Sequence, residues 1–164
     1  MDRSEFVARF GGIFEHSAWI AERTYDANPL PERLSADWLH DKMSAAFRAA
    51  SDEEKLNVLK AHPDLAGKLA VAGALTEDSR KEQAGAGLDR LTQVEFDRFT
   101  DLNTRYHAKF GFPFIIAVKG LTKDEILHAF ERRIHNSRQA EFETAAREVE
   151  KIARLRLSAM DFGQ

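Results

Sequence analysis

The chain has 164 residues, and its 24 lysines and arginines nearly balance its 27 aspartates and glutamates to leave a net charge of −3. A chain of this length can bury an apolar core as one domain without staples, and its charge excludes the basic field that would hold nucleic acid or an anionic membrane. Cysteine is absent, which excludes disulfide, thiolate and cysteine–metal chemistry.

The first residues, Met1 to Glu5, lack the apolar core of a signal peptide, and no apolar run approaches the roughly 20 residues of a membrane-spanning helix. The sequence therefore predicts a soluble, cytoplasmic protein. Its partner is expected to be a small molecule or another protein, with no nucleic acid and no membrane. The last residues, Asp161 to Gln164, are not a peroxisomal address, which agrees with this location.

Helix signals follow one another along the whole chain. Apolar residues from Phe6 to Ile20 predict two short helices separated near Gly11-Gly12, and Asn28 to Pro31 has the composition of a loop. Ser35 then precedes an apolar-periodic run from Trp38 to Phe47. Further helix starts are marked by capping boxes, in which an acid follows a Ser or Thr by three residues: Ser51 with Glu54, Ser79 with Glu82, Thr92 with Glu95, and Thr122 with Glu125.

The segment from Phe110 to Val118 departs from this helical pattern because it is aromatic and β-branched, with a glycine and a proline inside it. No comparable run exists for it to pair with, and an isolated strand would leave its amides unsatisfied. We expect an extended or partly helical buried segment whose backbone faces a ligand. With a last helix beginning near Gln139, the sequence predicts an all-α fold, a single compact domain over residues 1–164 of about seven or eight helices.

His62 is the first candidate for chemistry. Pro63 disfavours helical geometry at the residue before it, so His62 marks the end of a helix from about Asp52 to Ala61. An imidazole titrates near neutrality and suits proton transfer, but the C-terminal end of a helix also stabilises an imidazolium for structural reasons alone. Position by itself leaves the catalytic and the capping interpretation open.

Glu82 also has a structural explanation, since the capping box requires an acid at its offset from Ser79. The box does not explain Gln83 beside it, nor Gly85 and Gly87, which each cost a helix about 1 kcal/mol relative to alanine. These glycines predict the close approach of another helix or a ligand, and helix packing is the commoner cause. The start of this helix also offers free amides to an anionic ligand.

Arg156 stands out on the last helix. The apolar stripe of that helix consists of Phe142, Ala145, Ala146, Val149, Ile152 and Ala153. Arg156 continues the stripe, so its guanidinium is expected to point inward, whereas Arg154 falls off it. An inward arginine is costly unless it is paired, which leaves a structural ion pair, an oligomer contact or a carboxylate-binding role.

His128, Glu131 and His135 share one helical face and raise the question of a metal site. Their spacing is not that of the His-Glu-x-x-His zinc motif, and Glu131 can pair with Arg132 or Arg138 instead, so we expect a solvated face and no metal. Glycine-rich phosphate loops, nucleophile elbows and dinucleotide fingerprints do not occur, which argues against nucleotide and cofactor chemistry.

Four blocks of sequence occur in this order: His62-Pro63-Asp64-Leu65; Ser79-x-x-Glu82-Gln83 with Ala86-Gly87-Leu88; Asn103-x-x-Tyr106-x-x-Lys109-Phe110-Gly111-Phe112-Pro113-Phe114; and Arg154-Leu155-Arg156-Leu157. Together they resemble the OHCU decarboxylase family, whose members convert 2-oxo-4-hydroxy-4-carboxy-5-ureidoimidazoline (OHCU) to (S)-allantoin in urate breakdown. The resemblance extends from near Glu5 to near Met160.

This resemblance implies that His62 is the catalytic proton donor, Glu82 its acidic companion and Arg156 the anchor for the polar edge of the substrate. It also implies a homodimer. The implied substrate-binding positions are Pro63, Ser79, Arg80, Lys81, Glu82, Gln83, Phe114, Ile115, Ile116, Ala117 and Val118.

The chemistry of the implied reaction explains why no cofactor is expected. Loss of carbon dioxide leaves electron density next to a ring C=N or C=O system, which delocalises it without pyridoxal, thiamine or metal. The protein has to orient the carboxylate, bind the developing charge and deliver a proton to one face.

Two alternatives to this reading remain. The chain is a helical binding module if His62, Glu82 and Arg156 are merely two caps and an ion pair. Hydrolysis of the related ureide ring also uses histidine and arginine, but it is associated with a β-rich fold that the helical pattern disfavours.

Overall fold

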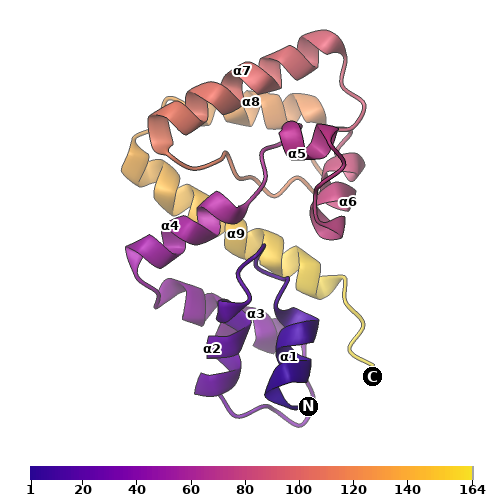
Figure 1. Ribbon diagram of the computed structural model, residues 1–164, viewed down its shortest axis with the longest axis vertical. Helices are drawn as coiled ribbons and strands as arrows, with labels where there is room; N and C mark the ends of the chain where they lie inside the picture. Colours follow the sequence, from indigo (N-terminus) through magenta and orange to yellow (C-terminus); the bar gives the residue numbers. More distant parts are fainter. Residues whose placement is uncertain (164) are drawn as a thin grey trace. The chain divides into compact units, whose positions relative to one another are not determined.

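The structure of the protein is a computed structural model that describes residues 1–163, apart from the side chains of Lys68 and Leu69. Within these residues it has no strand, and its nine helices are shown in Figure 1: α1 (Arg3–Phe10), α2 (Trp19–Ala27), α3 (Ala36–Arg48), α4 (Asp52–Ala61), α5 (Lys68–Val71), α6 (Glu77–Gly85), α7 (Gln93–Phe110), α8 (Lys123–Arg133) and α9 (Arg138–Ser158). All but the four-residue α5 have eight residues or more, which confirms the all-α prediction and its helix number. No helix in the described part of the chain is long and apolar enough to cross a membrane.

The chain divides into two compact units, and the boundary between them falls within α9. The first unit comprises Met1–Ala61 with Val149–Gln164, and the second comprises His62–Glu148. The single domain expected over residues 1–164 therefore stays a prediction.

In the first unit α1 packs against α2, and α2 packs against α3. The side chains buried in the three helices, in the connection between α1 and α2 and in the C-terminal part of α9 are predominantly apolar: Phe6, Phe10, Phe14, Ile20, Leu39, Met43, Phe47, Val149, Ala153 and Leu157. Val149 and Ala153 lie on the stripe predicted for the final helix. Phe14 and Phe47 contact each other at 5.6 Å between ring centroids.

The second unit is organised around Tyr106 of α7, which is fully buried. Four phenylalanine rings surround it at centroid distances of 4.4 to 5.9 Å: Phe110, Phe112, Phe114 and Phe130. Phe114 and Phe130 stack in parallel at 4.0 Å. Because Phe112 and Phe114 belong to the connection that follows α7, this cluster fixes that connection against α7 and α8.

The helix caps follow the sequence rules with one exception. Ser35, Thr92 and Thr122 cap α3, α7 and α8, and the Ser51–Glu54 pair forms its reciprocal bonds at the start of α4. The predicted box of Ser79 with Glu82 is wrong. Thr76 caps α6 by accepting a hydrogen bond from the Ser79 amide at 3.3 Å, so Ser79 already lies within the first turn of the helix. The acids at the first two helical positions favour this earlier start.

The close approach that was predicted at Gly85 and Gly87 is not observed. Among the described residues, no atom lies within 4 Å of the Cβ that a side chain would add at Gly85 or Gly87. Gly87 instead adopts a φ of +80°. The amides of Gly87 and Leu88 donate to the carbonyls of Ala84 and Gln83 at 3.0 and 2.9 Å. These two bonds form a Schellman motif, which requires the left-handed residue.

The segment from Pro113 to Val118 is neither helix nor strand in the structure. Phe114, Ile115, Ala117 and Val118 are buried, and Ile116 is partly exposed. The prediction that this segment is buried and does not form a strand is confirmed. It leaves the helical path directly after Gly111, whose φ of +79° ends α7.

Candidate active site

The predicted site residues fall into both units. His62, Pro63, the stretch Ser79 to Gln83 and the stretch Phe114 to Val118 belong to the second unit, whereas Arg156 belongs to the first. The convergence of these two sets of residues on one substrate stays a prediction.

His62 follows the last residue of α4 directly, as the proline after it predicts. Only 8% of the residue is exposed, so the imidazole is largely withdrawn from bulk water. A buried histidine exchanges protons with a bound molecule in preference to solvent, which is the situation a stereoselective proton donor requires.

The turn after His62 is held by polar side chains of α6 and α7. From α6, Gln83 accepts a hydrogen bond from the Ala66 amide at 3.0 Å and donates one to the Asp64 carbonyl at 3.2 Å. From α7, Asn103 donates to the Leu65 carbonyl at 2.9 Å, and His107 Nε2 donates to the Asp64 carboxylate at 2.6 Å. The backbone at this turn is therefore tied to two helices.

The predicted substrate-binding stretch of α6 is not uniform. Ser79 and Gln83 are buried and Glu82 is partly exposed, and their spacing puts these three residues on one face of the helix. Arg80 and Lys81 are exposed, and Lys81 pairs with Glu77 at 3.2 Å. The buried face is thus the part of α6 that is suited to hold a ligand in a fixed position.

A cavity of about 590 Å³ lies beside α6. Its lining includes Arg80 and Gln83 from α6, Leu88 and Thr92 from the following connection, and Phe96 from α7. Neither His62 nor Glu82 lines it. The cavity is large enough for a small molecule, but it touches only part of the predicted site.

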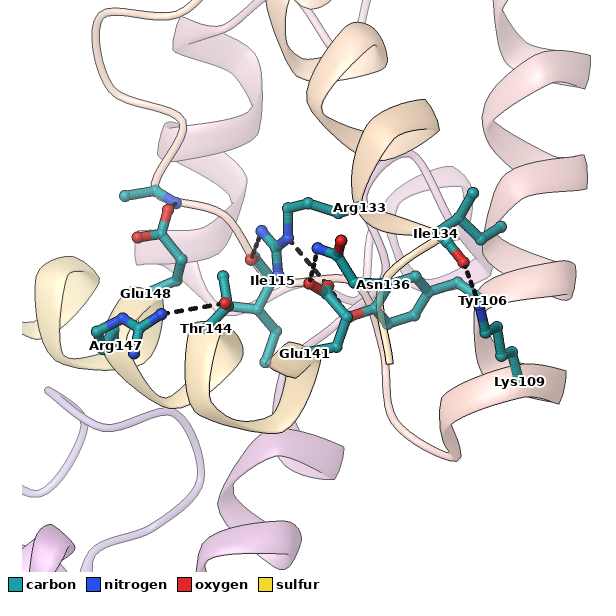
Figure 2. Close-up of polar contacts among 11 residues, drawn as sticks. Tyr106, Lys109, Ile115, Arg133, Ile134, Asn136, Glu141, Thr144, Arg147 and Glu148 are labelled. Atoms are coloured by element: carbon teal, nitrogen blue, oxygen red, sulfur yellow. Dashed lines mark hydrogen bonds and ion pairs between the residues drawn. The ribbon is translucent and has the colours of Figure 1, made fainter. Parts of the chain in front are cut away.

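The segment from Pro113 to Val118 is fixed from the side by a buried ion pair (Figure 2). Arg133 donates to Glu141 at 2.9 Å through Nε and to the Ile115 carbonyl at 2.7 Å through Nη1. Its guanidinium also lies 4.4 Å from the centre of the Phe114 ring. Further along the segment, the Ala117 amide donates to Glu148 at 3.2 Å.

Glu141 is the centre of this network. Besides Arg133 it accepts hydrogen bonds from the Tyr106 hydroxyl at 2.6 Å and from the Asn136 amide at 3.1 Å (Figure 2). Burial, reinforced by the hydrogen bond to Glu141, raises the pKa of the Tyr106 phenol far above its ordinary value. The phenol therefore keeps its proton and donates it in the hydrogen bond to Glu141.

These contacts leave other backbone groups of the segment available, among them those of Ile116. Ile115 and Ala117 use their carbonyl and amide on Arg133 and Glu148, whereas the backbone of Ile116 between them bonds to no other group in the described part of the chain. The segment therefore presents the amide and carbonyl of Ile116 in a fixed orientation, which supports the expectation that its backbone binds a ligand.

In the first unit Arg156 points inward, as its place on the stripe predicts, and its side chain is 4% exposed. It donates to the Glu15 carboxylate at 3.0 Å and to the carbonyls of Gly12 and Ile13 at 3.4 Å each. The ion-pair alternative is therefore observed, with a partner that the sequence did not indicate. Arg154 is half-exposed and pairs with Asp37 at 2.7 Å, so the two arginines are not equivalent.

The face that carries His128, Glu131 and His135 has another partner than the one expected. Glu131 pairs with Arg98 of α7 at 2.9 Å, rather than with Arg132 or Arg138. Among residues 1–163 the structure places no three histidine or acidic side chains where they could hold a metal ion together.

The family model described as OHCU decarboxylase matches residues 1–158. The chain belongs to the OHCU decarboxylase family. Similar members of the family include proteins named 2-oxo-4-hydroxy-4-carboxy-5-ureidoimidazoline decarboxylase from Haloferax volcanii and Halalkalicoccus jeotgali. The first is 43% identical over 96% of this chain and 90% of its own length, and the second is 42% identical over 97% and 86%.

Two solved structures are similar to this member of the OHCU decarboxylase family. A crystal structure of (S)-allantoin synthase has a TM-score of 0.76 and 34% identity over 97% of this chain, which spans 50% of that longer chain. A crystal structure of OHCU decarboxylase in the presence of (S)-allantoin has a TM-score of 0.67 and 26% identity over 85% of this chain and 88% of its own. The resemblance inferred from the four sequence blocks is therefore confirmed.

Three groups of this OHCU decarboxylase family member escaped the sequence analysis. Asn103 was noted only as part of a block, and His107 and the Arg133–Glu141 pair were not assigned any role. Their partners lie 8 to 43 positions away along the chain. No periodic pattern connects residues at such separations, so only the family blocks could have pointed to Asn103.

Proposed function

We propose that this protein decarboxylates OHCU to (S)-allantoin without a cofactor, as a carboxy-lyase of urate breakdown. The observation that carries the proposal is a family match over nearly the whole chain together with a buried histidine directly after α4. The proposal extends to the cytoplasm as the location and to a homodimer as the assembly.

The reaction follows from the chemistry of the substrate. The C–C bond to the carboxylate breaks, carbon dioxide leaves, and the electron pair passes into the adjacent ring system. A proton then adds from one side to the neighbouring ring carbon that bears the ureido group, and the hydroxyl on the carbon that lost carbon dioxide gives up its proton to become a carbonyl. Since the ring holds the electron pair, the rate depends on orientation, on hydrogen bonds to the developing charge and on the position of the proton donor.

Four of the predicted groups have a definite role in this scheme. His62 delivers the proton, and delivery to one face makes the product (S). Glu82 either orients His62 or binds the hydroxyl or ureido group of the substrate. The backbone of the Phe114 to Val118 segment orients the ring, where the Ile116 amide and carbonyl are available. Arg156 binds the polar edge of the substrate through its guanidinium, which the ion pair with Glu15 holds in place.

The test generates OHCU freshly with urate oxidase and hydroxyisourate hydrolase and follows the circular dichroism of allantoin. Wild type is expected to form (S)-allantoin rapidly, and His62→Ala only slow racemic product. His128→Ala, which changes an exposed histidine of α8, is the matched control and should behave as wild type. Racemic product at the uncatalysed rate from wild type would refute the decarboxylase and favour a helical binding module.

Assembly is tested on the same preparation. Sedimentation equilibrium should give twice the chain mass of 18.6 kDa for a homodimer, and the single mass would refute that part of the proposal.

A further inference from the structure

Asp64, Leu65 and Ala66 form a turn that follows His62 and Pro63 directly, so the geometry of this turn bears on the position of the imidazole. Ala66 has a φ of +52°, a left-handed conformation that residues with a Cβ rarely adopt. Such a conformation persists only where the surroundings hold it. The groups that hold this turn are therefore specific features of the site.

Three side chains from two helices supply that restraint, and we call them the turn clamp: Gln83 of α6, with Asn103 and His107 of α7. Gln83 uses its carbonyl oxygen on the Ala66 amide and its nitrogen on the Asp64 carbonyl. The carbonyl oxygen and the nitrogen of the Gln83 side chain thus both form hydrogen bonds to the backbone of the turn. Gln83 is also buried, so water does not compete for these bonds.

The two residues of α7 complete the clamp from a second direction. Asn103 is buried and donates to the Leu65 carbonyl at 2.9 Å. His107 lies one helical turn further along and donates to the Asp64 carboxylate at 2.6 Å. The turn itself is tight, since a Cβ at Gly67 would come within 2.6 Å of the Asp64 Cβ. Each of the three turn residues is therefore tied to a helix by at least one hydrogen bond.

We propose that the turn clamp consists of positioning residues that set the orientation of His62. The proposal rests on the proposed function in that His62 is taken as the proton donor. A donor displaced by a fraction of an ångström transfers its proton slowly and to either face, although the substrate still binds.

The test compares the kinetics of His107→Ala, Asn103→Ala and Gln83→Ala, each confirmed as folded by circular dichroism. All three are expected to lower kcat about tenfold, to leave KM within about twofold of wild type, and to lower the enantiomeric excess of allantoin. His107→Gln, which still donates to Asp64, should recover most of the loss. Arg105→Ala changes an exposed residue of α7 that pairs with Asp101 and is the matched control.

Coupling between the clamp residues gives a second criterion. Because Asn103 and His107 restrain the same turn, their double variant should lose less than the product of the two single losses. A raised KM with unchanged kcat in Gln83→Ala would make Gln83 a substrate contact and overturn the proposal for it. Unchanged kcat and enantiomeric excess in the folded His107→Ala variant would overturn the clamp as a whole.

A readout that does not depend on turnover separates this proposal from the proposed function. The imidazole resonances of His62, assigned by their loss in His62→Ala, should shift or broaden in the clamp variants and not in Arg105→Ala. If wild type fails to decarboxylate OHCU while these resonances respond, the proposed function fails and the positioning of His62 stands. If the resonances do not respond, the clamp is refuted whatever the activity.

Discussion

Replacing Glu141 by glutamine would test whether the second unit depends on its buried ion pair. Glu141 is completely buried and accepts hydrogen bonds from Tyr106, Arg133 and Asn136. Glutamine has almost the same shape, but it removes the charge that compensates Arg133 and brings an amide nitrogen where only acceptors fit. Removing one partner of a buried pair costs about 3–5 kcal/mol.

The expected fall in the melting temperature follows from the size of the protein. For chains of 150–250 residues each kcal/mol lowers the midpoint by about 2–4 °C, so Glu141→Gln should lower it by about 6–20 °C. Glu131→Gln is the matched control because it also breaks a pair with an arginine, Arg98, but one whose side chains are 37% and 43% exposed. An exposed pair contributes at most about 1 kcal/mol.

The assay is thermal unfolding of both variants, followed by far-ultraviolet circular dichroism. Equal small shifts for Glu141→Gln and Glu131→Gln would refute the reasoning, since they would mean that the buried network contributes no more than a surface pair. A large shift for Glu141→Gln alone would support it.

Two further predictions concern a glycine and a carboxyl group. Gly87→Ala should destabilise the protein by about 1–2 kcal/mol because the φ of Gly87, +80°, is left-handed. Gly12→Ala should leave stability unchanged or raise it, because Gly12 lies in open space and has no positive φ. Chemical denaturation of both variants tests this, and equal shifts of the two unfolding midpoints would contradict it. The hydrogen bond from Arg3, and then the charge of Arg3, lower the pKa of Asp26 below its ordinary value of 3.8. The pair therefore stabilises the folded protein at pH values above 3.8, and this stabilisation is lost as the pH falls through the lowered pKa of the folded state. Arg3→Ala should return the Asp26 pKa to near 3.8 in an NMR titration, and an unchanged pKa would show that Arg3 is not its cause.

Helix boundaries were predictable where a local signal dominates. The end of α4 at Ala61 follows from Pro63, and the starts of α7 and α8 follow from Thr92 and Thr122, because each depends on residues within one turn of the helix. The predicted start of α6 was wrong because Thr76 and Ser79 are both suitable caps, and the acids at the first two helical positions favour Thr76.

The candidate site was predictable only in part. His62 and Arg156 could be singled out from a proline and from a helical stripe, and the family resemblance supplied their roles. The partners could not be predicted, since Glu15 lies 141 residues from Arg156, and Asp64 lies 43 residues from His107. Contacts at such separations leave no periodic trace in the chain.

The sequence by itself determined the helical class, most of the caps, the irregular segment after α7 and, through its four ordered blocks, the family. These properties depend on interactions between near neighbours or on the order of conserved-looking motifs along one chain. Only the tertiary structure decided which polar groups are buried together: the Arg133–Glu141 pair that holds Ile115, and the turn clamp that holds the residues after His62. The reason is physical, because a buried polar group must find a partner, and the one it finds depends on how the helices pack.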